Sequence, residues 1–261
     1  MSNPNSRRLS AAINAATKAG EIVLHYAETS YSLETKGDGS PVTTADREAE
    51  RCIRNAVESE FPEDTLLGEE LGEQLGSSGY RWIIDPIDGT ASFIRGVPLY
   101  GTLIGIEHDH RMVAGVINLP GLDEMVFAES GRGAWHIVRG GEPRPAWVSA
   151  VSDVHDAMIC ITSFDYFKKT SRESEFQRIT GACRLMRGWS DCYGHMLVAT
   201  GRADAVVEPC IHPWDVAATM AIIKEAGGRY SDWRGEESAL SREGVVSNGR
   251  VHDGILRLLR P

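Results

Sequence analysis

Asp85 and Asp88 follow a short apolar run, at a spacing that lets two carboxylates converge across a turn. The run, residues 82–84, is typical of a buried strand that delivers Asp85 to the edge of a sheet. Gly89 and Thr90 come next, and their backbone N–H groups can point at an anion where a helix begins. Hard oxygen ligands beside an anion-binding turn suit Mg²⁺ and phosphate. These residues therefore predict a metal site that holds a phosphate.

Other positions separate this site from a purely structural turn. Pro86 has no N–H to donate, so we expect it to end the strand, and an Asp-Gly pair alone is typical of turns and helix caps. A second apolar run, residues 66–67, also leads to a carboxylate, Glu69. Far along the chain, Asp215 precedes an apolar segment, residues 216–223, that predicts a helix. Acidic residues at the ends of several elements favour the metal site.

Three motifs together resemble the inositol monophosphatase family, whose members are Mg²⁺-dependent phosphomonoesterases. They are residues 69–70, residues 85–90 and residues 214–217, in that order, and the resemblance spans nearly the whole chain. It implies an α/β (α+β) fold, a layered α/β/α/β/α sandwich of the sugar-phosphatase type, with an N-terminal antiparallel-sheet half and a C-terminal α/β half. It also implies a homodimer and two or three Mg²⁺ ions in each active site.

The resemblance also implies a set of metal ligands. Asp85 would bridge two ions, one completed by Glu69 and the carbonyl of Ile87, the other by Asp88 and Asp215. Bound cations would reverse the repulsion between clustered carboxylates and the substrate, and two metals roughly 3.5–4 Å apart can stabilise both the attacking and the leaving oxygen. Glu70 should point away from Glu69, as neighbours on a strand do, and we expect it to be a solvated acid.

Catalytic and phosphate-binding roles follow from the same resemblance. Glu69 and Thr90 would position the attacking water, and the N–H groups of Gly89 and Thr90 would receive a phosphate oxygen. Asp46 would tune the metal-bound water as a further catalytic residue. Thr43 and Asp46 also fit a capping box, which by itself could explain the acid. The sequence leaves both roles of Asp46 open.

Residues 187–194 and Glu208 bear on the substrate. Inositol monophosphatases usually carry small residues in this segment, whereas this chain has Trp189, Asp191 and Tyr193. The segment resembles that of the histidinol-phosphate phosphatases of the same family. An anionic Asp191 with Glu208 as a second substrate-binding residue would suit a cationic leaving group. This favours hydrolysis of L-histidinol phosphate to L-histidinol, a step of histidine biosynthesis, with inositol 1-phosphate as the alternative; Asp191 could instead only favour a helix N-terminus.

Two other classes of protein are open alternatives. Haloacid-dehalogenase-type phosphatases also carry two acids after a strand, but theirs are separated by one residue and the first is a covalent nucleophile. Two residues separate Asp85 from Asp88, which favours direct attack by water. The non-enzymatic alternative is a regulatory protein that binds a divalent cation through the same carboxylates.

Composition is compatible with an enzyme of sizeable core, since 42% of the 261 residues are hydrophobic. A net charge of −10 disfavours nucleic acid, whose backbone favours Lys/Arg clusters. Five scattered cysteines predict neither a disulfide framework nor a zinc site, so we expect a reducing cytoplasm. Polar residues interrupt any apolar signal core near the N-terminus, and no run is long enough to cross a bilayer, so we expect no contact with a membrane.

Apolar periodicity predicts the elements that must position these residues. Helical spacing over residues 9–24 and after Thr43 predicts two amphipathic helices. Residues 73–79 are polar and should form a loop, and short apolar runs over residues 100–138 predict an antiparallel meander. Strand and helix patterns then alternate over 158–162, 173–183, 205–207 and from 215 onward. We expect residues 1–147 to carry most metal ligands, residues 148–261 to carry Asp215 and the specificity residues, and the site to lie between them.

Overall fold

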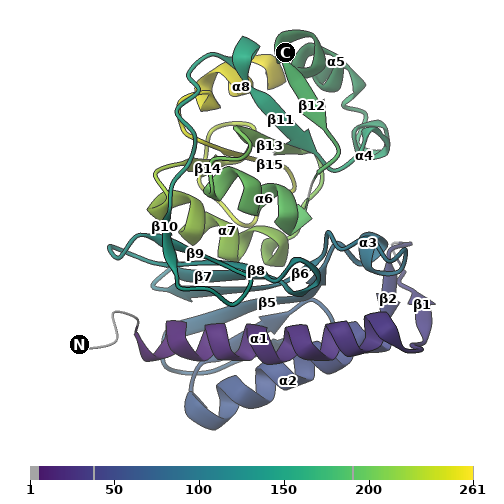
Figure 1. Cartoon of the computed structure of the whole chain (residues 1–261), viewed down its shortest axis with the longest axis vertical. Helices are drawn as coiled ribbons and strands as arrows, with labels where there is room; N and C mark the ends of the chain where they lie inside the picture. Colours follow the sequence, from purple (N-terminus) through teal and green to yellow (C-terminus); the bar gives the residue numbers. More distant parts are fainter. Residues whose placement is uncertain (1–5, 38, 190, 261) are drawn as a thin grey trace.

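The computed structural model describes residues 6–37, 39–189 and 191–260, and it stacks helices and sheets in alternating layers (Figure 1). Its helices are α1 (Arg7–Glu28), α2 (Thr44–Glu60), α3 (Thr90–Phe93), α4 (Phe164–Lys169), α5 (Glu173–Ala182), α6 (Asp191–Ala199), α7 (Pro213–Glu225), α8 (His252–Leu259) and the short 3₁₀ turns Pro120–Leu122 and Val154–Asp156. α1 and α2 cover one face of a large sheet, α6 and α7 lie between it and a smaller sheet, and α4, α5 and α8 cover the smaller sheet's far face. The predicted α/β/α/β/α sandwich is confirmed.

The larger sheet has eight strands in the order β10-β9-β8-β7-β6-β5-β3-β4. Their bounds are β3 (Thr65–Gly68), β4 (Gly72–Gln74), β5 (Tyr80–Asp88), β6 (Gly101–His108), β7 (Arg111–Leu119), β8 (Glu124–Glu129), β9 (Ala134–Val138) and β10 (Arg144–Ala146). The run from β5 to β10 pairs antiparallel, which confirms the meander, and β3 lies parallel to β5. The loop predicted over residues 73–79 is wrong at its start, because Glu73 and Gln74 pair with Leu67 and Leu66 as the edge strand β4.

The smaller sheet has five strands in the order β12-β11-β13-β15-β14. They are β11 (Met158–Ile161), β12 (Leu185–Arg187), β13 (Ala205–Glu208), β14 (Arg229–Ser231) and β15 (Gly244–Ser247). Alternate side chains of these strands enter different cores, as the strand period of two requires. Cys160, Val206 and Val246 face α6 and α7, whereas Ile159, Val207 and Val245 face α5 and α8. A separate hairpin of β1 (Leu33–Thr35) and β2 (Pro41–Thr43) precedes α2.

α7 is seated directly on the larger sheet by a pair of glycines. Gly105 of β6 and Gly115 of β7 are cross-strand partners. A Cβ atom on Gly105 would lie 2.6 Å from the Cβ of Ala217, and one on Gly115 would lie 2.2 Å from the carbonyl oxygen of Ala218. Only glycine permits so close an approach of helix and sheet backbones. The glycine pair therefore fixes the height at which the start of α7, with Asp215, lies above the sheet.

One hydrophobic core joins side chains on both sides of the expected division at residue 147. It contains Leu103 and Ile117 of the larger sheet together with Met196, Val206 and Ile222. The division into residues 1–147 and 148–261 stays a prediction, and this shared core shows that residues from both parts pack together.

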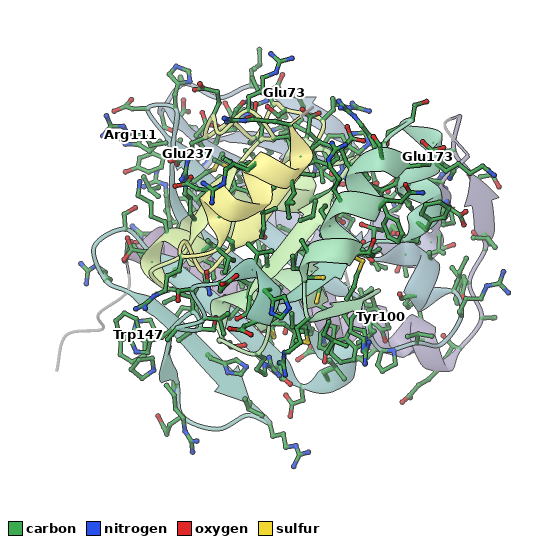
Figure 2. All side chains as sticks on the ribbon, turned by 90° about the horizontal axis from the view of Figure 1, so that it is seen from above. Glu73, Tyr100, Arg111, Trp147, Glu173 and Glu237 are labelled. Carbon is green, nitrogen blue, oxygen red and sulfur yellow. The ribbon has the colours of Figure 1, made fainter. Side chains whose placement is uncertain are left out.

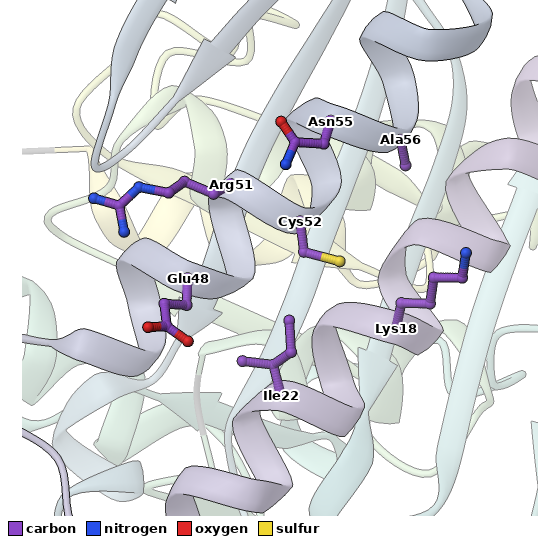
Figure 3. Close-up of a pocket in the computed structure, with 7 residues that line it drawn as sticks. All are labelled: Lys18, Ile22, Glu48, Arg51, Cys52, Asn55 and Ala56. Carbon is purple, nitrogen blue, oxygen red and sulfur yellow. The ribbon is translucent and has the colours of Figure 1, made fainter.

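Charged side chains surround the molecule, Glu73, Arg111 and Glu173 among them (Figure 2). A groove between α1 and α2 is lined by Lys18, Ile22, Glu48, Arg51, Cys52, Asn55 and Ala56 (Figure 3). None of the predicted metal ligands lines this groove, so it is separate from the acidic site. Within the described part of the chain, the combination of length and apolarity that a bilayer-crossing helix needs does not occur.

Candidate active site

Asp85 and Asp88 lie at the end of β5, on either side of an irregularity in its pairing with β6. β5 continues through Pro86 to Asp88, so the expectation that Pro86 ends the strand is wrong. Proline is tolerated at this bulge because the ladder needs no N–H there, and the Pro86 carbonyl instead accepts a hydrogen bond from the Thr102 hydroxyl at 2.9 Å. The bulge places two acids close together where a regular strand would separate them.

Asp215 reaches the same place from α7. It is the third residue of that helix, and its Oδ2 accepts the His212 backbone N–H at 2.8 Å, as in a capping box. Ligand oxygens of Asp85, Asp88 and Asp215 all lie within 4.8 Å of one another. The structure thus brings together three of the acids that the sequence singled out.

Glu69 extends this cluster on the β3 side of β5. Its backbone N–H donates to the carbonyl oxygen of Ile84 at 3.1 Å, which holds it beside the end of β5. The charge of Glu69 raises the pKa of Asp85 after burial, as expected for two carboxylates at one site. Four carboxylates from β3, β5 and α7 therefore form one continuous group.

Lys36 is a member of the site that sequence reasoning missed. Its Nζ lies 2.6 Å from Glu69 Oε1 and 2.5 Å from Glu70 Oε1. Although burial lowers it, the pKa of Lys36 lies above its ordinary value because of these two carboxylates. The Glu70 side chain is only 6% exposed, so the expectation of a solvated acid is wrong. The lysine follows β1, and no local pattern in the sequence connects that hairpin with Glu69 or Glu70.

Asp46 forms the predicted capping box, and its second oxygen faces Thr90, whereas the tuning of a metal-bound water stays a prediction. Its Oδ2 accepts hydrogen bonds from the Thr43 N–H at 2.7 Å and the Thr43 hydroxyl at 2.6 Å, which completes the capping box of α2. Its Oδ1 lies 3.4 Å from the Thr90 hydroxyl. The same hydroxyl lies 2.9 Å from the carbonyl oxygen of Ile87. The structure therefore connects Asp46 through Thr90 to a predicted carbonyl ligand.

Gly89 is the N-cap of α3 and has a φ of 82°, a conformation that favours glycine. A Cβ atom here would lie 2.8 Å from the Leu99 carbonyl oxygen and 3.5 Å from Asp191 Oδ2. The start of α6 also contacts the acidic cluster. The Cys192 N–H donates to Asp88 Oδ2 at 2.5 Å. This bond, which the sequence did not predict, fixes one oxygen of Asp88 and brings Asp191 to the edge of the site.

Burial and mutual repulsion raise the pKa values of the clustered carboxylates. Burial holds the pKa of Asp85 well above its ordinary value, and the charges of Glu69 and Asp88 raise it further. Burial likewise raises the pKa of Asp88, followed by the charges of Asp191 and Asp215, and the pKa of Asp215 is raised mainly by burial. Buried acids at such short range can be ionised together only if a cation compensates their charge. The set is all oxygen, which fits a hard ion such as Mg²⁺.

A second group of polar residues lies beside the cluster. Glu208 ends β13, is 4% exposed, and has its Oε2 3.0 Å from Nε2 of His195. The negative charges of Asp191 and Glu208 both raise the pKa of Asp88, as expected for carboxylates at the same site. Tyr166 of α4 also faces this region, since its pKa is raised by burial and then by Asp191. Residue 190 lies outside the described residues.

The layered fold and the cluster of oxygen ligands are those predicted for a metal-dependent phosphatase. In agreement with this, a model of the inositol monophosphatase family matches residues 5–261, and the chain belongs to that family. It is a phosphoric monoester hydrolase that acts on small-molecule phosphate esters. The enzymatic interpretation is therefore confirmed, and the haloacid-dehalogenase and purely regulatory alternatives are not supported.

Similar proteins cover almost the whole chain. A histidinol-phosphatase from Chlorobaculum parvum is 44% identical over 92% of this chain and 91% of its own length. A histidinol-phosphatase from Mycobacterium tuberculosis is 34% identical over 95% of this chain and 96% of its own. The crystal structure of the extragenic suppressor protein SuhB from Bartonella henselae superimposes with a TM-score of 0.89, at 29% identity, over 98% of this chain and 99% of that one.

Proposed function

We propose that this enzyme hydrolyses L-histidinol phosphate to L-histidinol with Mg²⁺, as a step of histidine biosynthesis. The observation that carries the proposal is that Asp191 and Glu208 lie beside the predicted metal ligands. Two carboxylates at this place can form ion pairs with the ammonium of an amino alcohol. Inositol is neutral, so its hydroxyl groups can donate hydrogen bonds to such a pair but cannot form an ion pair with it. The similarity to proteins named histidinol-phosphatase supports the same substrate.

Five groups would hold the metal, namely the carboxylates of Glu69, Asp85, Asp88 and Asp215 and the carbonyl of Ile87. Bound Mg²⁺ would neutralise the phosphoryl oxygens and activate water. Because Asp88 is held by the Cys192 N–H and Asp215 by the His212 N–H, these ligands are oriented before any substrate arrives. Such preorganisation limits the reorganisation that the reaction would otherwise require.

The protein's own groups would orient water and phosphate. The Thr90 hydroxyl donates toward Ile87 and Asp46, so it would accept a hydrogen bond from the attacking water, which Glu69 would also orient. The N–H groups of Gly89 and Thr90, at the start of α3, would donate to a phosphate oxygen. The leaving alcohol would then face Asp191 and Glu208.

The first experiment measures phosphate release from several monoesters. We expect L-histidinol phosphate to be cleaved far better than inositol 1-phosphate, with activity lost in EDTA and recovered with Mg²⁺. Asp88→Asn should lower kcat by at least about a hundredfold with the fold retained, since even partners behind a metal ligand are worth about 10–100-fold. Better turnover of inositol 1-phosphate would replace the proposed substrate by the inositol ester.

The role of Asp191 is tested separately. Asp191→Ala should erode the preference for L-histidinol phosphate more than it erodes hydrolysis of a neutral-alcohol ester, because it removes a charge that only the ammonium needs. Equal losses on both esters would remove Asp191 from substrate recognition.

We also propose a homodimer that works in the cytoplasm, on the resemblance to the family and the scattered cysteines. Light scattering behind a size-exclusion column should give twice the 28.5 kDa of one chain. A monomeric mass would overturn the dimer.

A further inference from the structure

A buried chain of polar side chains lies behind Glu208. His195 of α6 is 1% exposed, and its two ring nitrogens contact two different elements. Nε2 lies 3.0 Å from Glu208 Oε2 at the end of β13, and Nδ1 lies 2.9 Å from the Thr219 hydroxyl of α7. Thr219 is 0% exposed. These residues link three elements that surround the expected place of the leaving alcohol.

The hydrogen-bonding capacities of these groups define the direction of the chain. An ionised carboxylate only accepts, so Nε2 of His195 must carry the hydrogen that it donates to Glu208. A neutral imidazole then has its lone pair on Nδ1, which accepts the hydrogen of the Thr219 hydroxyl. The arrangement Thr219 to His195 to Glu208 satisfies both ring nitrogens of His195 without a buried positive charge. The carboxylate thereby selects the tautomer, and the threonine hydroxyl satisfies the ring nitrogen that is left without a hydrogen.

We propose that His195 and Thr219 are positioning residues that hold Glu208 Oε2, so that the other carboxylate oxygen and the charge of Glu208 are presented to a substrate ammonium beside Asp191. This inference rests on the proposed function. His195 takes one oxygen of the carboxylate and fixes the side-chain torsions, which lowers the entropy cost of binding the amine. The charge of Glu208 raises the pKa of both Asp88 and Asp215, which places the glutamate near the predicted metal ligands.

Packing alone does not account for this chain. The neighbours of His195 on α6, Met196, Leu197 and Val198, are buried and apolar. A buried carboxylate with a polar partner is often no more stable than apolar residues of similar size. The same protein also buries a second histidine with hydroxyl partners only, since the His252 nitrogens each lie 2.8 Å from a serine, Ser231 and Ser247. A carboxylate is therefore not required merely to bury a histidine in this fold.

The test removes the hydroxyl and leaves the volume. Thr219→Val should raise KM for L-histidinol phosphate by about tenfold, because the loss of one buried hydrogen bond loosens the glutamate, while kcat changes less than about twofold. For inositol 1-phosphate and glycerol 2-phosphate, which have neutral alcohols, both constants should change less than about twofold. Thr219→Ser, which restores the hydroxyl, should restore KM.

A double-mutant cycle and a matched control complete the test. In Glu208→Gln the charge is gone but His195 can still donate to the amide oxygen, so Thr219→Val added to this variant should produce no further rise in KM. Ser247→Ala removes a hydroxyl from the other buried histidine, His252, and should alter stability without altering the ratio of KM values. This control separates positioning from a general loss of stability.

The outcomes distinguish the two proposals. If the unmutated enzyme has no preference for L-histidinol phosphate, the proposed function and this inference fall together. If that preference exists, and Thr219→Val lowers kcat equally on all esters or adds its full effect on top of Glu208→Gln, the positioning role is wrong and the proposed function stands. If Thr219→Val does not fold, the KM values of Glu208→Gln and His195→Gln for L-histidinol phosphate answer the same question. Equal rises in KM support the inference. An unchanged KM in His195→Gln overturns it.

Discussion

Asp46 uses its two carboxylate oxygens for different partners, which makes its roles separable. Thr43→Ala removes both capping contacts of the Thr43 hydroxyl, including the one with Asp46 Oδ2, and should lower the free energy of unfolding by about 1 kcal/mol with near-normal activity. Asp46→Asn should lower kcat at least about tenfold, because it removes the charge facing Thr90. Urea denaturation and phosphate release measure the two effects. Equal activity losses in both variants would mean that Asp46 acts only through the helix cap.

His252 predicts how stability depends on pH. Burial, and then the charge of Arg229, lower the pKa of His252 to about 4, with Asp253 opposing weakly. A group whose folded pKa lies below its unfolded pKa contributes its full stability above the unfolded value and loses it as pH falls, here between about 6.5 and 4. The loss should approach about 3 kcal/mol, since one unit corresponds to about 1.4 kcal/mol.

The measurement compares the unmutated protein with His252→Gln by urea denaturation at about pH 7.5 and pH 4.5. The difference between the two proteins isolates this residue from the acidic cluster, whose protonation acts in the opposite direction. Parallel stability curves would show that His252 does not titrate on unfolding as described.

At the scale of single residues, the sequence predicted the grouping of those acids whose neighbours along the chain form a recognisable pattern. Asp85 and Asp88 follow a buried run, and Asp215 precedes a helix, so pattern and spacing were sufficient. Lys36, His195 and Thr219 were not predicted, because each acquires its partner only through tertiary packing, between elements that are distant in sequence. Glu70 was placed wrongly for the same reason, since a lysine from another hairpin covers it.

At the scale of elements, the close packing of α7 on the larger sheet determines where Asp215 lies. Gly115→Ala should cost about 1–3 kcal/mol of stability, because the added methyl group would lie 2.2 Å from the Ala218 carbonyl oxygen and force α7 away. Displacement of Asp215 should also weaken the binding of Mg²⁺, and half-maximal activity should then require a higher Mg²⁺ concentration. Gly181→Ala is the matched control, since a Cβ there meets nothing within 4 Å, and it should stabilise by about 0.5–1 kcal/mol. An unchanged Mg²⁺ requirement in Gly115→Ala would show that the packing of α7 on the sheet does not control the binding of Mg²⁺.

Element prediction succeeded where a local signal marks the boundary. The capping box of Thr43 and Asp46 indicated the start of α2, and turns between apolar runs indicated the meander. It failed for β4, whose polar residues form a strand only because β3 offers an edge, and for Pro86, where a bulge removes the usual penalty. Both errors come from sheet pairing, which is not encoded in a short window of sequence.

At the scale of the whole molecule, the layers bring acids from α2, β3, β5, α6, β13 and α7 to one place. The charge that accumulates there is what a bound cation must offset, and it makes the metal-free fold sensitive to pH. Because the folded pKa values of Asp85, Asp88 and Asp215 are raised, the metal-free protein keeps their contribution below the unfolded pKa and loses it as pH rises through the folded values.

Metal removal and return should therefore change thermal stability in a pH-dependent way. After chelation, Mg²⁺ should raise the melting temperature more at about pH 8 than at about pH 5.5, because protons compete for the same oxygens at low pH. Asp215→Asn should melt above the unmutated protein without metal at about pH 8, since it removes a repelling charge, and yet gain less from Mg²⁺ since it removes a ligand. Calorimetry on both proteins measures the four melting temperatures. If the melting temperature of Asp215→Asn rises as much with Mg²⁺ as that of the unmutated protein, the cation does not bind at this carboxylate. The expected result is a higher melting temperature without metal and a smaller rise with Mg²⁺. It requires Asp215 to be both a source of the repulsion and a ligand of the ion that relieves it.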